Sequence, residues 1–426
     1  MQHRRQRSRV VEIPQQRSPG SKTRATAATG SRGGSRNGGV EQQGWDVNWD
    51  DFLVDAATDT GMRRMNNQDS HAIVRASTQD AWQSRGHLFM VADGMGAHAV
   101  GELASKLACD NIPHNYRKSK GGSASEAIVK AYKEVGGLIH GKATANKEFH
   151  GMGTTCSTLI LLPEGALLAH VGDSRIYRVR HDVIEQYSFD HSLVWELVRR
   201  NHLSPDQASR AVPRNVITRS LGPDPNVEVD VIGPIPVEQG DVFLLCSDGL
   251  SGPVSDSELG VFAANFHPSD AARYVLYLAN LRGGHDNITA VMLHIGQWAE
   301  PGTDEHAVLN GKSKQPAPSS KGWKTMLQGI LSRKSAKPVL EPPTPHRTAP
   351  CAITNQMIET LEEVVRKAQE LAIAQTWSLD WTEFAETRRI LADAKTNGNL
   401  RASLKSLGEQ IVMLGMAGRL YKKGLH

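Results

Sequence analysis

Three aspartates at the edges of short apolar runs constrain the fold of this chain more than any other sequence feature. Asp93 and Asp248 each close such a run and are followed by glycine, and Asp286 precedes the run Asn287-Ile-Thr-Ala-Val-Met-Leu. Apolar runs of about five or six residues closed by Asp-Gly are too short for a helix and are typical of buried strands. The last residue of such a strand emerges at a sheet end, so we predict that the three carboxylates meet there.

We predict that these carboxylates share a metal site. Carboxylates brought together at a sheet end repel one another unless a cation lies between them. No cluster of Cys and His accompanies them in the sequence. Hard oxygen donors of this kind suit Mg²⁺ or Mn²⁺ rather than Zn²⁺.

Length and composition set loose bounds on what surrounds this site. The 426 residues favour one catalytic domain of about 250 residues plus appendages. Lys and Arg number 49 against 45 Asp and Glu, so the net charge does not indicate a specific nucleic-acid partner. The four cysteines lie far apart with no CxxC pair, as expected for reduced core thiols in a cytoplasmic protein. No apolar stretch reaches the roughly 18 to 20 residues that span a bilayer, and the N-terminus has no apolar signal core, which predicts no transmembrane segment.

The sequence divides into four predicted parts. Residues 1–44 are rich in Arg, Gly, Ser and Thr with few large apolar residues, which predicts a disordered basic tail. Residues 52–298 are a dense succession of strand-like and amphipathic segments and form the predicted catalytic domain. Residues 301–351 are rich in Pro, Ser and Lys, as in a linker. Residues 352–426 are predicted to form a helical hairpin or a three-helix unit.

Within the catalytic domain, neighbouring strands and grouped helices predict an α+β fold with antiparallel pairing. After a first run at Phe52, the candidate strands are 71–75, 87–92, 154–162, 166–171, 175–179, 228–232, 241–246 and 287–295. The candidate helices are 99–115, 123–141, a stretch near 191–211, and 268–282.

The C-terminal part carries two apolar seams with helical spacing. They are Met357, Leu361, Val364, Ala368 and Leu371, and then Leu400, Leu404, Leu407, Ile411 and Leu414. Between them, Asp380 with Glu383 resembles a capping box, and Asn397-Gly398 supplies a stop. The seams favour an intramolecular core, with a dimerisation or docking module as the alternative.

Two basic segments outside the catalytic domain leave alternatives open. The tail could hold nucleic acid or an acidic surface nonspecifically, or it could be inert or the product of a wrongly assigned start codon. Residues 321–334 have the spacing of a basic amphipathic helix that touches a membrane surface or a partner. A short helix packed on its own protein, or a disordered segment, is the favoured interpretation of that pattern.

An ordered series of eight motifs resembles the metal-dependent protein phosphatase family of type 2C in its bacterial form. The motifs are Arg64-Met-Asn-Asn-Gln-Asp, Asp93-Gly-Met-Gly-Ala-His, Gly153-Thr-Thr, Gly172-Asp-Ser-Arg, Asp190-His-Ser, Thr218-Arg-Ser-Leu-Gly, Ser247-Asp-Gly-Leu and Asp286-Asn-Ile-Thr. Each motif alone is a weak signal, but eight in the family's order across residues 52–298 are a strong one. The resemblance implies two central antiparallel sheets flanked by helices, an α-β-β-α sandwich, here with a small C-terminal all-α unit.

The resemblance also implies a site for two Mn²⁺ or Mg²⁺ ions. Asp93 would bridge the ions, Gly94 would offer its backbone carbonyl, and Asp248 and Asp286 would complete the ligands. Asp69 would act on the metals largely through bound water. The ions would lower the pKa of a water held between them, so that hydroxide attacks phosphorus directly.

Three further residues have both a functional and a purely structural interpretation. Arg64 matches a phosphate-clamping arginine, whose guanidinium fork suits phosphate oxygens, although spacing alone would make it a surface arginine. Asp173 matches a residue used around a third, weaker metal, although it could simply cap a turn between two strands. His98 is the nearest candidate for a general acid, although it could be a hydrogen-bonded turn residue.

We assign no catalytic role to the other motifs of the series. Gly153-Thr-Thr and Thr218-Arg-Ser-Leu-Gly are predicted to position turns, and Asp190 or Ser192 to cap a helix. Residues 188–217 correspond to the family's flap beside the substrate cleft. Its arginines, Arg199, Arg200, Arg210 and Arg214, could help to receive a phosphopeptide or could be solvated surface charges.

The sequence departs from the family pattern at three positions near the site. Gln68 stands where many members have Glu, which puts metal affinity in doubt. Ala97 replaces a usual Gly, and Met95 stands where eukaryotic members have a histidine general acid. Other phosphatase chemistries lack their motifs: no cysteine is followed by arginine six positions later, and there is no GDxHG and no phosphate-binding GxxxxGK[ST] loop.

Two functions from different classes follow. The first is a protein-serine/threonine phosphatase in signal transduction, acting on phosphorylated proteins and resembling a partner of Hanks-type kinases. The second is a non-catalytic phosphoprotein-binding module whose C-terminal helices regulate or recruit. Retention of Arg64 together with the three metal-site aspartates favours the first, since a binding module need not keep a full set of ligands.

Overall fold

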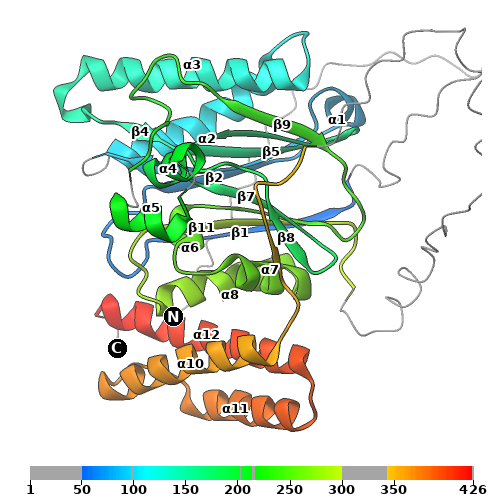
Figure 1. Ribbon diagram of the computed structural model, residues 1–426, viewed down its shortest axis with the longest axis vertical. Coiled ribbons are helices and arrows are strands. Elements are labelled where there is room, and N and C mark those ends of the chain that lie inside the picture. The colour runs from blue at the N-terminus through cyan, green and yellow to red at the C-terminus, as the bar shows by residue number, and fades with distance from the viewer. Residues whose placement is uncertain (1–49, 97–99, 202, 214–215, 300–342, 425–426) are drawn as a thin grey trace, which may run out of the picture. The chain divides into compact units, whose positions relative to one another are not determined.

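The computed structural model describes residues 50–96, 100–201, 203–213, 216–299 and 343–424 (Figure 1). The N-terminal segment 1–44, most of the segment interpreted as a linker, residues 321–334 and His98 lie outside the described residues.

Two antiparallel sheets form the centre of the fold. The first sheet contains, in order, β1 (Phe52–Asp59), β11 (Ile288–Ile295), β10 (Val242–Cys246), β7 (Arg175–Arg180), β8 (Val183–Gln186) and β12 (Arg347–Pro350). The second contains β2 (Asp69–Val74), β3 (His87–Met95), β5 (Cys156–Leu162), β6 (Gly165–Val171) and β9 (Asp230–Ile235), and β4 (Gly153–Thr154) pairs with β3.

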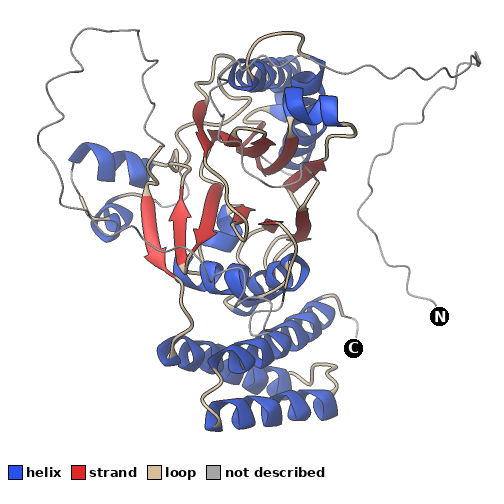
Figure 2. Cartoon of the chain, turned by 90° about the vertical axis from the view of Figure 1, so that its right-hand side faces the viewer, coloured by secondary structure: helices blue, strands red, loops and turns tan. Residues whose placement is uncertain are grey.

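Helices cover the outer face of each sheet (Figures 1 and 2). The second sheet is covered by α2 (Val100–Lys118) and α3 (Ala124–Ala145), and the first by α7 (Asp256–Asn265) and α8 (Pro268–Leu281). The shorter helices are α1 (Gln79–Arg85), η1 (Lys147–Phe149), α4 (Leu193–Asn201), α5 (Pro205–Ala211) and α6 (Asp248–Ser251). The predicted α-β-β-α sandwich is therefore confirmed.

The alternation of side chains along β5 explains why the sequence of this strand is apolar throughout. Leu159 and Leu161 point into the core between the two sheets. Cys156, Ile160 and Leu162 point to the opposite face and pack beneath α2 and α3. A strand that is buried on both faces has no solvent-facing position, so the polar alternation of a half-buried strand is lost.

The predicted strands and long helices are present within a few residues, but several other elements were not predicted. The strands β8 and β12, the helix α7 and the short helices α1, η1 and α6 have no counterpart among the predicted elements. The end of the segment interpreted as a linker is instead strand β12, which pairs antiparallel with β8. Cys351, directly after this strand, packs so closely on Gly260 that a β-carbon there would lie 2.5 Å from the β-carbon of Cys351.

Three helices, α10 (Asn355–Ala374), α11 (Trp381–Thr396) and α12 (Leu400–Lys422), form the C-terminal unit (Figure 2). Asp380 caps α11 by accepting from the amides of Thr382 and Glu383, at the predicted position. The α12 seam packs as predicted, since Leu404, Leu407, Ile411 and Leu414 belong to one core with α8.

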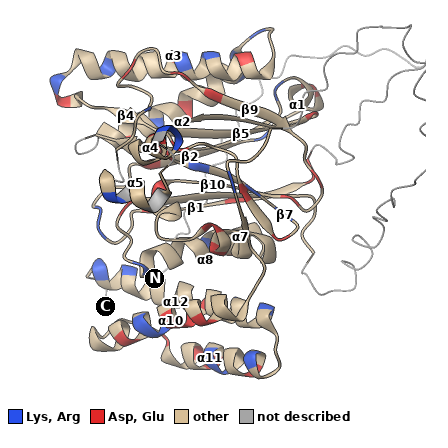
Figure 3. Cartoon of the chain, viewed as in Figure 1, with Lys and Arg blue, Asp and Glu red and all other residues tan. Residues whose placement is uncertain are grey.

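The predicted seam of α10 is wrong at its C-terminal end. Its buried residues are Ile358, Leu361, Val365, Ala368 and Ala372. Leu371 is 45% exposed, because the buried stripe is turned by one residue from the predicted one. The outer surfaces of α10 and α11 carry interspersed acidic and basic side chains (Figure 3), several of them paired, as in Arg366 with Glu363 and Glu370.

All four cysteines are buried and unpaired, as predicted. Among the described residues, no helix combines the length and the apolar character needed to cross a membrane.

Candidate active site

Five aspartates come together where strands of both sheets begin or end. Asp93 lies near the end of β3 and stands opposite Asp69, the first residue of β2, in the antiparallel register. Asp248 follows β10 after one residue, Ser247. Asp286 lies just before β11, and Asp173 lies in the turn between β6 and β7. The sheet register thus gathers residues that are more than 200 positions apart in the sequence.

Burial and repulsion from neighbouring carboxylates raise the pKa values of Asp69, Asp93, Asp173 and Asp248. Burial raises the pKa of Asp93 well above its ordinary value, and the charges of Asp69, Asp248, Asp173 and Asp286 raise it further. Burial likewise raises the pKa of Asp69 to about 7, against hydrogen bonds that favour its charged form. Loss of solvation disfavours a carboxylate, and a like charge nearby disfavours it again. The same causes raise the pKa of Asp173 and of Asp248.

Unpaired buried oxygens fit a cation at this place. The Oδ1 atoms of Asp69, Asp173 and Asp248 are buried and accept no hydrogen bond. A buried carboxylate oxygen without a partner costs free energy unless a cation or water satisfies it. Within the described ranges no group of three or more Asp, Glu, His or Cys side chains is arranged so that it could hold a metal ion by itself. Mg²⁺ is commonly held by one or two carboxylates and several waters, so an open arrangement of this kind fits it.

Gly94 lies at a point where no side chain would fit. A β-carbon there would lie 2.0 Å from the carbonyl oxygen of Gly101 and 2.7 Å from that of Gln68. The Gly94 amide donates to the same Gln68 carbonyl at 3.0 Å. Gln68, the departure noted from the sequence, donates from Nε2 to the Gly96 carbonyl at 3.4 Å. This side chain therefore contacts the loop after Asp93.

Arg64 lies beside the aspartates on the loop between β1 and β2. We call residues 60–68 the arginine loop. The Arg64 Nη2 donates to Asp286 Oδ2 at 2.7 Å, and this hydrogen bond raises the pKa of the guanidinium. The side chain is 51% exposed, which leaves the remaining donors of its planar fork accessible.

Sequence reasoning missed the residue that fixes both ends of the arginine loop. Asn287 is buried, and its Nδ2 donates to the carbonyls of Thr60 and Asn66 at 3.0 and 2.9 Å. Its Oδ1 accepts from the amide of Gln68 at 2.7 Å. The signal was present, since Asn287 directly follows Asp286 in a quoted motif, but only the fold shows which backbone groups it meets.

Two hydroxyl residues hold aspartates in place and were also missed. Ser247 Oγ donates to Asp69 Oδ2 at 2.7 Å and accepts from the Thr289 amide at 3.0 Å. The Asp93 amide donates to Thr155 Oγ1 at 2.9 Å, and Thr155 in turn contacts Ser174. The sequence predicted only that the Gly153-Thr-Thr motif positions a turn, whereas Thr155 also holds the backbone of Asp93.

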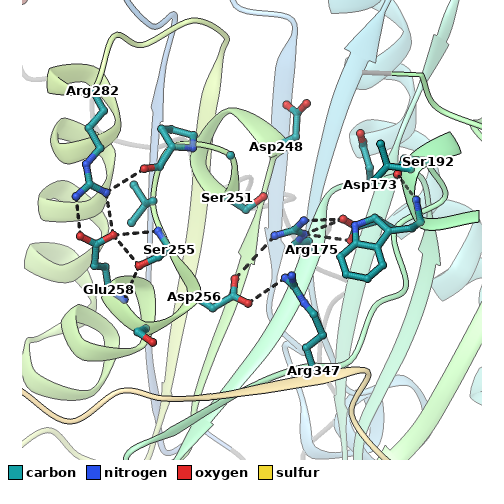
Figure 4. Close-up of a pocket in the computed structure, with 17 residues that line it drawn as sticks. Asp173, Arg175, Ser192, Asp248, Ser251, Ser255, Asp256, Glu258, Arg282 and Arg347 are labelled. Carbon is teal, nitrogen blue, oxygen red and sulfur yellow. Dashed lines mark hydrogen bonds and ion pairs between the residues drawn. The ribbon is translucent and has the colours of Figure 1, made fainter. Parts of the chain in front are cut away.

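A cavity of about 620 Å³ lies beside Asp173 and Asp248 (Figure 4). Arg175 binds Asp190 with Nη2 at 2.7 Å, and Arg347 binds Asp256 at 2.9 Å. Arg347 belongs to β12, so the segment after the catalytic domain contributes to the wall of this cavity.

Of the two residues predicted to cap a helix, Ser192 and not Asp190 lies at the start of α4, because the Asp190 carboxylate accepts hydrogen bonds from Arg175 and from Gln186 Nε2. Ser192 is at the start of α4, where its carbonyl accepts from the Glu196 amide and its Oγ lies 3.5 Å from the Trp195 amide. Of the flap arginines, Arg199 and Arg200 both pair with Glu196. Arg214 and the candidate general acid His98 lie outside the described residues.

Comparison with known proteins identifies the family. Residues 67–280 match the family model described as Protein phosphatase 2C. The chain is 31% identical over 249 residues to the protein phosphatase PhpP of Streptococcus pneumoniae, covering 57% of this chain and 98% of PhpP. It is 33% identical over 241 residues to the serine/threonine phosphatase stp of Listeria innocua, covering 55% and 93%. The structure of the serine/threonine phosphatase Stp1 from Staphylococcus aureus is similar with a TM-score of 0.53 and 28% identity, covering 61% of this chain and all 100% of Stp1. The chain therefore belongs to the protein phosphatase 2C family.

Proposed function

We propose that this protein is a metal-dependent serine/threonine protein phosphatase that hydrolyses phosphate monoesters on proteins. The observation that carries the proposal is the group of buried aspartates with unpaired oxygens beside the accessible guanidinium of Arg64. Membership of the protein phosphatase 2C family supports it, as do relatives that are named serine/threonine phosphatases.

The donor set favours Mn²⁺ or Mg²⁺ at two positions. Asp93, Asp248, Asp286 and the Gly94 carbonyl would be the ligands, with Asp69 acting through water and Asp173 beside a third, weaker ion. When bound, these cations lower the pKa of a water and so supply hydroxide for attack on phosphorus near neutral pH.

Arg64 would bind and orient the phosphate group of the substrate. A guanidinium presents two parallel donors to phosphate oxygens and stabilises the charge that develops as the bond to the leaving group breaks. The bond to Asp286 would fix the direction of the side chain, and Asn287 would fix the loop that carries it. His98 remains our candidate for protonating the leaving group.

Phosphorylated proteins, including Hanks-type kinases and their substrates, are the proposed partners in a cytoplasmic signalling role. Binding of a further partner by the C-terminal helices, or their dimerisation, is a separate proposal. The burial of the α12 seam against α8 instead supports an intramolecular role for that face.

Turnover of a phosphothreonine peptide and of p-nitrophenyl phosphate tests the function. We expect activity with Mn²⁺ or Mg²⁺, its loss with excess EDTA, and its loss in Asp248→Asn. Asp270→Asn, an exposed carboxylate on α8, is the control and should retain activity. A metal-loaded wild type that binds the phosphopeptide without hydrolysing it would instead establish the binding module.

A further inference from the structure

The last turn of α12 contacts the backbone of the arginine loop. Arg419 Nη1 donates to the Gly61 carbonyl at 2.7 Å. Lys422 Nζ donates to the carbonyls of Gly61 and Arg64, both at 3.2 Å. The C-terminal unit therefore binds the residue that carries the phosphate-binding guanidinium, 358 positions earlier in the sequence.

An ion pair anchors Arg419 at this position. Its Nη2 lies 2.8 Å from Asp59 Oδ2, and the side chains are only 15% and 12% exposed. The other oxygen of Asp59 accepts from the Gly61 amide at 2.8 Å. Gly61 is thus held at its amide by Asp59 and at its carbonyl by Arg419, so the ion pair fixes the orientation of one peptide unit on each side of this residue.

Gly61 and the two residues after it also contact the segment that carries Asp286. Its φ is +73°, and a β-carbon there would lie 2.0 Å from the backbone carbonyl of Asp286. The following amides, of Met62 and Arg63, donate to the Gly284 carbonyl at 2.7 and 3.1 Å. The arginine loop is therefore enclosed between the segment that carries Asp286 and the end of α12.

Small residues let α12 approach the catalytic domain closely enough to make these contacts. A β-carbon at Gly408 would lie 2.9 Å from the Tyr274 ring, and one at Gly415 would lie 2.5 Å from the Tyr277 ring. Both tyrosines belong to α8, against which α12 packs along its length (Figure 1). Close packing of two helices fixes the position of the last turn more firmly than a surface contact would.

We propose that Arg419, assisted by Lys422, is a positioning residue for Arg64. The C-terminal helical unit is then part of the catalytic apparatus, because it holds the arginine loop in the conformation that directs the guanidinium at the aspartate site. The inference rests on the proposed function to the extent that Arg64 binds the phosphate of the substrate.

Hydrogen exchange in the metal-free, full-length protein tests the structural half of the proposal without any turnover. Arg419→Met should speed exchange of the Gly61, Met62 and Arg63 amides by about tenfold or more, since local opening exposes them. Arg401→Met is the matched control, because Arg401 donates to the Asn265 carbonyl from the opposite end of α12. It should leave exchange of the loop unchanged. Unchanged exchange in both Arg419→Met and Lys422→Met would overturn the proposal whether or not the protein is a phosphatase.

A double-variant cycle with Arg64 separates positioning from general stability. Arg419→Met should lower kcat/KM for the phosphothreonine peptide by about tenfold, as expected for a misplaced binding group, and Arg419→Lys should recover part of the loss. In an Arg64→Ala background the same substitution should have no further effect, because Arg419 acts through Arg64. Multiplied losses in the double variant would mean that Arg419 supports only the fold. A wild type without turnover would defeat the proposed function, and the exchange experiment alone would then decide the role of Arg419.

Discussion

Arg64 and Asp286 are joined by a hydrogen bond of 2.7 Å, although 222 positions separate them in the sequence. One residue is the proposed phosphate-binding group and the other a proposed metal ligand, so the bond connects the two halves of the site. Asp286 orients the guanidinium while the outer part of its fork remains accessible to a substrate.

Replacement of Arg64 should damage catalysis more than folding. Arg64→Ala should lower kcat by about 10² to 10³ fold, the range expected when a donor to the developing charge is removed. Arg64→Lys should be intermediate, because lysine keeps the charge but loses the planar fork. Steady-state kinetics with a phosphothreonine peptide measure this, with Arg63→Ala, an exposed neighbour, as the control. Equal losses in Arg63→Ala and Arg64→Ala would contradict a specific role.

Ser247→Ala should weaken metal binding as well as stability. The substitution removes the donor to Asp69 and the acceptor of the Thr289 amide, at a cost of about 1–3 kcal/mol in the free energy of unfolding. Metal affinity should also fall by about 10 to 100 fold, as for other residues that orient a metal ligand. Ser188→Ala is the matched control, since Ser188 is buried and accepts from the Ile176 amide. Calorimetric titration with Mn²⁺ should find weaker binding only in Ser247→Ala; weaker binding in both would point to a general loss of structure.

Gly61→Ala should disturb the aspartate site through a backbone clash. Gly61 has a φ of +73° and meets the Asp286 carbonyl, whereas Gly121 has a φ of +69° and a β-carbon added there would meet no atom within 4 Å. Alanine at either position should lower the free energy of unfolding by about 1–2 kcal/mol, because an L-residue is strained at a positive φ. Only Gly61→Ala should also lose Mn²⁺ affinity and turnover. The prediction fails if the two variants match in thermal stability and in activity.

Stability should fall as the pH drops from about 6.5 to about 4, in part because of His170. Burial lowers the pKa of His170 from 6.5 to about 4, and the nearby charge of His191 contributes. The unfolded chain therefore takes up the proton first, so this stability is present above pH 6.5 and is lost as the pH falls through the window. Urea unfolding at several pH values should show that the free energy of unfolding falls less steeply with decreasing pH in His170→Gln than in the wild type. His114→Gln, an exposed position on α2, should keep the wild-type slope.

Much of the catalytic fold was predictable because the strands β3, β5, β6, β10 and β11 are buried on both faces. Runs such as Val242–Cys246 have no polar alternation and end in Asp-Gly or Ser-Asp-Gly, so both the strand and the emerging carboxylate were evident. The elements that were missed lack this signal. Strand β12, Arg347–Pro350, contains a proline and only four residues, and it exists because the edge of β8 accepts it.

By itself the sequence determined the strands, the long helices, the family motifs and the aspartates that end buried runs, because these depend on local periodicity and on residue type. Tertiary structure alone decided which groups meet across the chain. Asn287 reaches both ends of the arginine loop, Ser247 holds Asp69, and Arg419 binds the carbonyl of Gly61. Such contacts depend on which strands pair and on how closely α12 packs against α8, and local periodicity does not show which partner each element takes.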